Sequence, residues 1–150
     1  MKKAAAYWDA SALVPLCIHE DASRLARTQL RRFTPVVWWG STVEVHSAIC
    51  RMLRAKEITS NERQGAALRL LMLSRGWSEI LPSEDLRELA MQLLDQYALR
   101  AADSLQLAAA LVWCGQRPAK RNFICGNWRL SEAAEALGFS VLELKEAMKQ

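Results

Sequence analysis

The chain has 150 residues, a formal net charge of +4 and a hydrophobic content of 51%, with only six glycines and four prolines. This composition supplies one sizeable core, excludes a disordered or low-complexity chain, and permits an anionic partner such as nucleic acid. No apolar run is long enough to cross a membrane, and the apolar stretch after Met1 reaches Asp9 too soon for a signal peptide. The four widely spaced cysteines indicate neither a zinc site nor a disulfide framework. We therefore expect one cytoplasmic domain, residues 1–150, without membrane association.

The first half of the chain alternates predicted strands and helices. A short apolar run from Lys3 to Asp9 predicts a buried strand that ends in a carboxylate. Ser11 is the predicted N-cap of the next helix, which accommodates Pro15 only in its first turn. The elements predicted after it are a helix over 22–33 that ends at Thr34 and Pro35, a strand over 36–39, a helix that begins at Ser41, and a helix over 60–75.

The second half continues this alternation. The predicted elements are a weak strand over 77–81, a helix capped by Ser83, a buried helix that Asp103 opens, a strand over 122–125, a helix over 130–137 stopped by Gly138, and a short strand over 140–142. Gln106 is the exception in the buried helix, which is otherwise apolar from 105 to 113. Alternating strands and helices predict an α/β fold with a central, mostly parallel sheet flanked by helices.

Three acidic residues lie where these elements begin or end. Asp9 follows the first strand, Glu44 lies in the first turn of the helix from Ser41, and Asp103 opens the buried helix. Strand ends and the helix starts that follow them share one edge of a parallel sheet, so the three carboxylates can converge there. Packed carboxylates repel one another unless a cation neutralises them, and oxygen ligands of this kind suit Mg²⁺ or Mn²⁺.

Each acid also has a purely structural interpretation. Asp9 can cap the helix or turn the chain, and Asp103 can be an N-cap. Ser41 and Glu44 have the spacing of a capping box, in which Glu44 bonds back to the start of its own helix. Spacing alone does not establish that the three acids meet.

Four segments resemble the motifs of PIN-domain ribonucleases, in the family's order and spacing and over essentially the whole chain. They are residues 7–14, residues 42–48 with Glu44, residues 99–110, in which Asp103 begins a buried alanine-rich helix, and residues 123–130 followed by Ala133, Ala134 and Gly138. The third motif is the most specific of the four. Among single-domain proteins of this size, the chain looks most like the VapC toxins of bacterial toxin–antitoxin pairs.

The resemblance implies a PIN-like three-layer domain that binds Mg²⁺ or Mn²⁺ and cleaves RNA endonucleolytically. Asp9 and Asp103 match the family's main metal-binding acids, and Glu44 matches the second acid. Ser11 matches a small hydroxyl beside the first acid, where it orients Asp9 or a bound water. Toxin members commonly form homodimers and are held inactive by a small antitoxin. The implied partners are therefore RNA, a cognate antitoxin protein and a second copy of the chain.

The fourth motif departs from the family pattern, which usually has Thr-x-Asp where this chain has Cys125-Gly126-Asn127. An asparagine carbonyl can accept hydrogen bonds or ligate a metal weakly, but it brings no negative charge and cannot act as a base. Asn127 also suits the N-cap position of the helix that carries Leu130. We therefore expect a weakened fourth position and weaker metal binding.

The first hypothesis is a Mg²⁺-dependent endoribonuclease of the VapC type, with Asp9, Glu44 and Asp103 as the catalytic and metal-binding residues. The alternatives are a catalytically weakened PIN fold that binds RNA or protein, and a PIN nuclease of RNA maturation without an antitoxin. Some of the basic residues on two successive helices and before Asp103 are expected to contact RNA phosphates. These residues are Arg51, Arg54, Lys56, Arg63, Arg69, Arg75 and Arg100.

Overall fold

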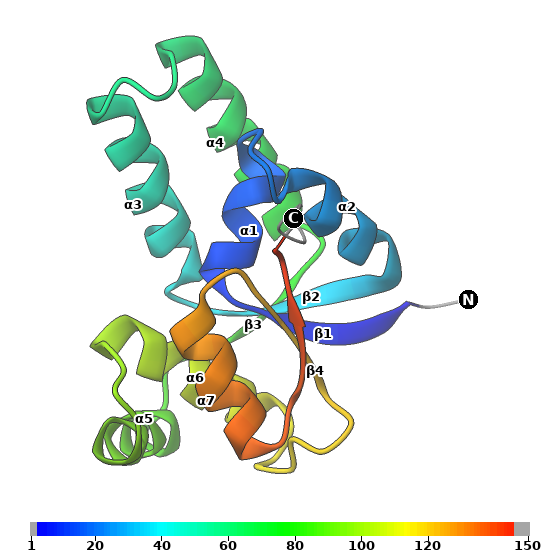
Figure 1. The fold of residues 1–150 in the computed structure, drawn as a ribbon, viewed down its shortest axis with the longest axis vertical. Coiled ribbons are helices and arrows are strands. Elements are labelled where there is room, and N and C mark those ends of the chain that lie inside the picture. Colours follow the sequence, from blue (N-terminus) through cyan, green and yellow to red (C-terminus); the bar gives the residue numbers. More distant parts are fainter. Residues whose placement is uncertain (1–2, 146–150) are drawn as a thin grey trace, which may run out of the picture.

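The computed structural model describes residues 3–145, which form five strands and seven helices (Figure 1). In chain order they are β1 (Ala4–Trp8), α1 (Ala10–Cys17), α2 (Ser23–Arg32), β2 (Phe33–Trp38), α3 (Ser41–Arg54), α4 (Ser60–Ser74), β3 (Ser78–Ile80), α5 (Glu84–Gln96), α6 (Ala101–Trp113), β4 (Asn122–Cys125), α7 (Trp128–Leu137) and β5 (Ser140–Glu143). The strand predicted over 122–125, the helix start at Ser41 and the Ser83 cap of α5 are confirmed, and the other predicted elements are present with one or both ends shifted. Within residues 3–145, no helix is both long enough and apolar enough to span a membrane.

The five strands form one parallel sheet in the order β3-β2-β1-β4-β5. The chain builds outward from β1 through β2 and β3, and then crosses back to place β4 and β5 on the other side of β1. The strand order therefore reverses between β1 and β4. Open α/β sheets bind ligands at such a reversal, beyond the carboxyl ends of the strands. Asp9 follows β1 and Asn127 lies two residues beyond β4, so both lie at this position.

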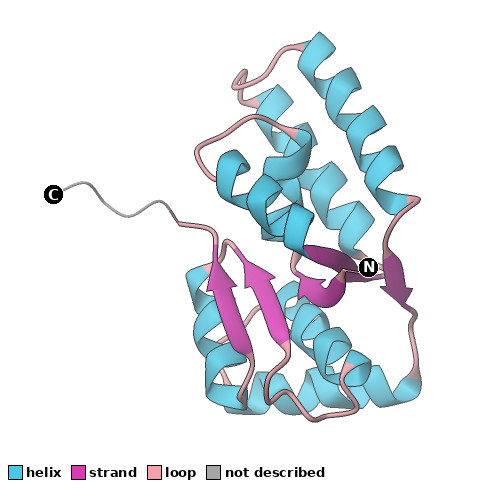
Figure 2. Cartoon of the chain, turned by 90° about the vertical axis from the view of Figure 1, so that its right-hand side faces the viewer, coloured by secondary structure: helices cyan, strands magenta, loops and turns pink. Residues whose placement is uncertain are grey.

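The sheet is the middle of three layers (Figure 2). Along β1, Ala6 and Trp8 pack against the layer of α1 to α4, whereas Tyr7 packs against the layer of α5 to α7. Successive side chains of a strand point to opposite faces, so a strand covered on both sides reads as a continuous apolar run. The three-layer α/β fold expected from the sequence is confirmed.

The start of α1 differs from the sequence-based prediction, because its N-cap is Asp9 and not Ser11. The Asp9 side chain accepts a hydrogen bond from the backbone N–H of Ser11, and α1 begins at Ala10. Pro15 consequently lies in the second turn, where its missing N–H leaves the carbonyl of Ser11 without its helical donor. That carbonyl lies beside Gly126, where an added Cβ would come within 3.2 Å of it. The glycine therefore allows the turn after β4 to pass close to the start of α1.

Phe33, Thr34 and Pro35 extend β2, contrary to the prediction that they end the second helix. Pro35 is paired with Ala6 of β1, whereas β3 pairs with β2 only from Val36 to Trp38. On the β3 side, Pro35 therefore lies at a free edge of β2. A proline is tolerated there because no ladder partner requires its missing N–H.

Candidate active site

One cavity at the carboxyl edge of the sheet is lined by every residue that the sequence singled out for the site. Asp9, Ser11, Glu44, Asp103 and Asn127 all line this cavity, whose volume is about 170 Å³. Asp9 and Ser11 come from the end of β1 and the start of α1, and Glu44 and Asp103 come from the first turns of α3 and α6. Asn127 is the N-cap of α7. The parallel topology therefore brings together side chains that are up to 118 residues apart.

Asp9 is 4% exposed, and its Oδ2 atom is the centre of a network of donors. The backbone N–H of Ser11 donates to it at 3.1 Å, the Ser11 hydroxyl donates to it as well, and the Cys125 thiol lies 3.8 Å away. Burial raises the pKa of Asp9, the hydrogen bonds from Ser11 lower it, and the charge of Asp103 raises it further. Ser11 thus orients the Asp9 carboxylate and favours its ionised form.

Ser11 is itself held by the turn after β4. The backbone N–H of Gly126 donates to its hydroxyl oxygen at 2.9 Å. This bond leaves the hydroxyl hydrogen free to be donated to Asp9. Two motifs that lie more than a hundred residues apart in the sequence are therefore connected through one serine side chain.

Glu44 does not close a capping box, because α3 has Gly40 at its N-cap and no side-chain cap bond. Its Oε1 atom instead accepts a hydrogen bond of 2.9 Å from Nε2 of Gln106, on α6. Burial, followed by the charges of Asp9 and Asp103, raises the pKa of Glu44 to about 7, against the lowering effect of the bond from Gln106. The carboxylate is therefore costly to ionise unless a cation lies beside it.

Asp103 lies in the first turn of α6 and is not the N-cap that the sequence allowed, because the helix begins at Ala101. The backbone N–H of Arg100 donates to its Oδ2 atom at 3.3 Å. Its Oδ1 atom accepts a hydrogen bond of 3.3 Å from Nδ2 of Asn127. Both oxygens of Asp103 therefore already have a donor from the protein.

The carbonyl of Asn127 is used for capping and does not face Asp103. Its Oδ1 atom accepts a hydrogen bond of 3.1 Å from the backbone N–H of Arg129, which confirms the predicted N-cap of α7. Since a backbone N–H can only donate, this bond fixes which end of the amide is oxygen and leaves the NH₂ group for Asp103. Asn127 is thus a hydrogen-bond donor to the acid, where an aspartate at this position would present a fourth carboxylate.

The chemistry of the cavity fits a hard cation held with part of its water shell. Its acidic atoms are all carboxylate oxygens, which are the ligands that Mg²⁺ and Mn²⁺ prefer. In the part of the chain that the structure describes, no group of three or more His, Cys, Asp and Glu side chains is arranged to hold a metal ion. Mg²⁺ commonly takes one or two carboxylates and keeps several waters. The cavity volume of about 170 Å³ has room for an ion with several waters, because a water occupies about 30 Å³.

Sequence reasoning assigned no site role to Gln106 and Tyr7, although both belong to the hydrogen-bond network behind the acids. Both side chains are fully buried, and the Tyr7 hydroxyl donates to Oε1 of Gln106. A single polar residue in the otherwise apolar stretch from 105 to 113 was the signal for Gln106. Cys125 was likewise given no site role beyond its departure from the motif, but its thiol lies against Asp9 and burial raises its pKa to about 12.

Of the basic residues proposed as phosphate contacts, Arg51 lines the cavity of the acids. It is exposed on α3, so its guanidinium can meet a ligand that enters from solvent. Arg69 lies elsewhere and lines a separate cavity between α1 and α4. Its Nη1 atom donates to the carbonyl of Cys17 at 2.9 Å. Arg51 is therefore placed beside the acids, whereas Arg69 lies at a different cavity.

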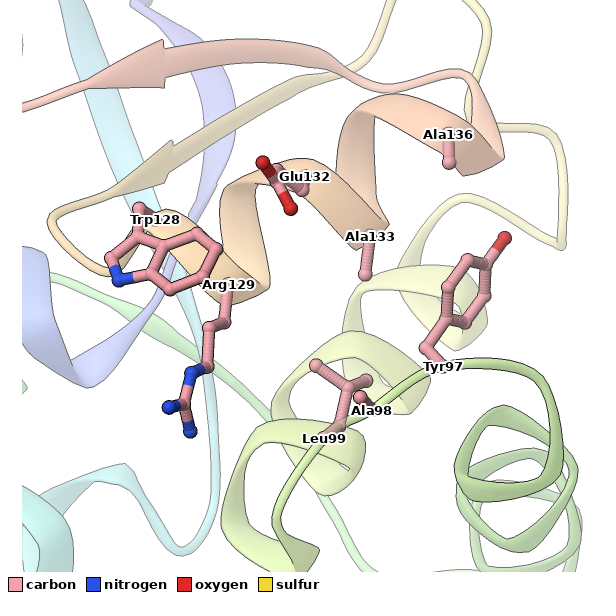
Figure 3. Close-up of a pocket in the computed structure, with 8 residues that line it drawn as sticks. All are labelled: Tyr97, Ala98, Leu99, Trp128, Arg129, Glu132, Ala133 and Ala136. Carbon is pink, nitrogen blue, oxygen red and sulfur yellow. The ribbon is translucent and has the colours of Figure 1, made fainter.

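A larger groove of about 600 Å³ lies close to the acids (Figure 3). One wall is the segment Tyr97, Ala98 and Leu99 before α6, and the other is α7 from Trp128 to Ala136. Both walls adjoin Asp103, because Leu99 precedes Arg100 and Trp128 follows Asn127, the two residues that donate to that acid. Trp128 is 53% exposed, and the Arg129 guanidinium lies 5.6 Å from the centre of its ring. We call this the α7 groove.

No family model and no curated protein matches this sequence. Solved structures do match the fold over nearly its whole length, and three of them are a toxin–antitoxin complex from Klebsiella pneumoniae, PAE2754 from Pyrobaculum aerophilum and FitAcB from Neisseria gonorrhoeae. Their TM-scores are 0.66, 0.64 and 0.63, at identities of 19%, 16% and 11%. The matches cover 95%, 94% and 93% of this chain and 100%, 90% and 97% of the other chains. The fold is PIN-like. At these identities the likeness establishes the PIN-like fold alone, and this is the fold that the four motifs predict.

Proposed function

We propose that this chain is a metal-dependent endoribonuclease that hydrolyses RNA phosphodiester bonds, and that it is the toxin of a toxin–antitoxin pair. The observation that carries the proposal is that Asp9, Glu44 and Asp103 line one cavity at the carboxyl edge of a PIN-like sheet. Further support comes from the fold, since one of the similar structures is described as a toxin–antitoxin complex.

The residues of the cavity have distinct roles in this proposal. Asp9, Glu44 and Asp103 would hold Mg²⁺ or Mn²⁺, partly through water, and each is already oriented by a donor from the protein. The ion would supply charge stabilisation at the phosphate and make a water more acidic. Burial of Asp9 would strengthen its interaction with a cation.

Two neighbouring features fit RNA as the substrate. Arg51 lines the same cavity and is placed to contact a backbone phosphate. Trp128 presents an exposed indole in the α7 groove, beside the residues that bond to Asp103. Exposed aromatic rings stack on unpaired bases with little sequence preference. We therefore propose that a single-stranded segment of RNA runs from the acids into the α7 groove.

We further propose that the protein acts in the cytoplasm, forms a homodimer and is held inactive by a small antitoxin. The cavity suggests how inhibition would work, because a basic side chain of the antitoxin would neutralise the same carboxylates that otherwise need a cation. Toxicity on expression, and its rescue by a neighbouring gene for a short protein, would separate a toxin from a nuclease of RNA maturation.

The test is cleavage of a structured RNA by the purified protein with Mg²⁺, with Mn²⁺ and with EDTA. We expect metal-dependent cleavage that falls at least about 100-fold in Asp103→Asn, which keeps the size of the side chain but removes its charge. Asp95→Asn, at an exposed position of α5, is the matched control and should cleave like the parent chain. Equal cleavage by the parent chain and Asp103→Asn would show a contaminating nuclease or a wrong site.

One observation favours a second candidate function. Nδ2 of Asn127 donates to Asp103, so this carboxylate already has a hydrogen-bond donor in the absence of a cation. A folded protein that binds no Mn²⁺ at millimolar concentration and cleaves no RNA would instead be a PIN fold that binds RNA or protein.

A further inference from the structure

Gln106 is a polar side chain in a buried, mostly apolar helix. It projects from α6, whose buried positions are otherwise mostly alanine and leucine, and its exposed fraction is 0%. Burying an amide costs free energy unless its donors and acceptor are paired. All of its partners are in place: the Tyr7 hydroxyl donates to Oε1, and Nε2 donates to Ser41 Oγ at 3.0 Å and to Glu44 Oε1 at 2.9 Å.

The Tyr7 hydroxyl supports one orientation of this amide. It donates to Oε1 of Gln106, and Nε2 then lies on the side of Ser41 and Glu44. An ionised Glu44 can only accept, so the same orientation satisfies the carboxylate. Without the phenol, Oε1 would lose its buried donor and the amide would be held less firmly against Glu44. Tyr7 thereby acts on Glu44 through Gln106, although the two side chains are on different elements, β1 and α3.

The arrangement leaves the two carboxylate oxygens of Glu44 in different situations. Oε1 is anchored by Gln106. For Oε2, no hydrogen-bond partner is found among residues 3–145, and Glu44 lines the cavity with Asp9 and Asp103. Neither Tyr7 nor Gln106 lines that cavity. A partner that binds one oxygen and holds the plane of a carboxylate is the arrangement by which outer residues orient metal ligands.

We propose that Tyr7 and Gln106 are positioning residues that orient the Glu44 carboxylate toward a divalent cation in the cavity. The proposal rests on the proposed function only in that it takes Mg²⁺ or Mn²⁺ as the ligand. A purely structural role, in which the buried pair only holds α6 against the sheet, is the competing explanation. The two explanations differ in whether removal of the phenol oxygen acts through Glu44.

The test measures the dissociation constant for Mn²⁺ by the electron paramagnetic resonance signal of the free ion. Tyr7→Phe removes one oxygen atom and retains the ring that stacks on Phe123. We expect Mn²⁺ to bind about 3–10-fold more weakly to Tyr7→Phe and at least about 10-fold more weakly to Gln106→Met, which keeps the length of the side chain but has no donor. Ser74→Ala, which removes a side-chain oxygen on α4 outside the cavity and the α7 groove, is the control and should bind Mn²⁺ like the parent.

A second pair of proteins separates positioning from packing. In the Glu44→Gln background, Tyr7→Phe should change the Mn²⁺ dissociation constant less than twofold, because the residue through which it acts no longer carries the charge. Urea unfolding without metal identifies any loss of stability. Mn²⁺ binding is then compared without urea, at a temperature at which each variant is folded. A structural role would lower stability and leave the Mn²⁺ dissociation constant unchanged, or would weaken binding equally in both backgrounds, and either result overturns the proposal.

The outcomes also separate this inference from the proposed function. Coupling of Tyr7 to Mn²⁺ binding through Glu44, in a protein that cleaves no RNA, would support the inference and refute the nuclease. Metal-dependent cleavage with no effect of Tyr7→Phe on Mn²⁺ binding would refute the inference alone. A parent chain that binds no Mn²⁺ at millimolar concentration would overturn both.

Discussion

Replacing Glu44 by glutamine should stabilise the protein in the absence of metal, but only at higher pH. The pKa of Glu44 rises from 4.5 to about 7 in the folded protein. Between these values the folded state keeps a proton that the unfolded state releases, so the free energy of unfolding falls as the pH rises. At about 1.36 kcal/mol per pH unit the full effect above pH 7 is about 3 kcal/mol, but Glu44 is partly exposed and solvent screening reduces it to about 1–2 kcal/mol.

The assay is urea unfolding in EDTA at pH 4.5 and pH 8, for the parent chain and Glu44→Gln. Glutamine keeps an oxygen for the bond from Gln106, so the variant isolates the charge. We expect near-equal stability at pH 4.5, where Glu44 is largely protonated when folded, and a gain of about 1–2 kcal/mol for the variant at pH 8. Glu88→Gln, at an exposed position of α5, should show no such gain. A variant that is no more stable at pH 8, or equally more stable at both pH values, would refute the reasoning.

Two further predictions concern the neighbouring residues. Asn127→Asp replaces the donor to Asp103 by a fourth carboxylate, so the free energy of unfolding of the metal-free protein should fall by about 1–3 kcal/mol at pH 8 while the Mn²⁺ affinity rises. Asn127→Ser is the control, because it keeps a capping side chain without the charge. A tighter Mn²⁺ complex in Asn127→Ser as well would contradict the explanation. Trp128→Ala should weaken binding of a single-stranded RNA about tenfold in fluorescence anisotropy measurements, whereas Trp39→Ala, which removes a comparably exposed indole outside the α7 groove, should have little effect; equal losses in the two variants would rule out a specific stacking site.

The fold was largely predictable because the local patterns agree with one another. Short apolar runs alternate with amphipathic stretches along the chain, and this alternation is typical of parallel strands joined by helices. Both faces of β1 are buried, which is why Tyr7 and Trp8 could read as one continuous apolar strand. The errors occurred at element ends, where two local interpretations compete. Asp9 and Ser11 are both good N-caps, and Pro35 breaks helices but is also tolerated at an unpaired strand edge.

The candidate site could be predicted only at the level of residues. The positions of Asp9, Glu44 and Asp103 at the ends of strands and starts of helices indicate a common edge, because parallel topology brings such positions together. Which atoms meet there was not predictable, because it depends on side-chain directions across the interfaces between elements. The capping-box pattern at Ser41 illustrates this point, since Glu44 bonds to Gln106, 62 residues away, and not to its own helix.

The sequence by itself determined the order of the elements, the alternating α/β architecture and the positions of the acids, since these follow from periodicity, helix signals and the residues at strand ends. Only the tertiary structure decided how the acids are supported. It directs the amide of Asn127 at Asp103 through the cap of α7, and it buries Tyr7 and Gln106 behind Glu44. The physical reason is that a hydrogen bond needs atoms within about 3 Å and in the right direction, and only the packing of α3, α6 and α7 against the sheet supplies that geometry.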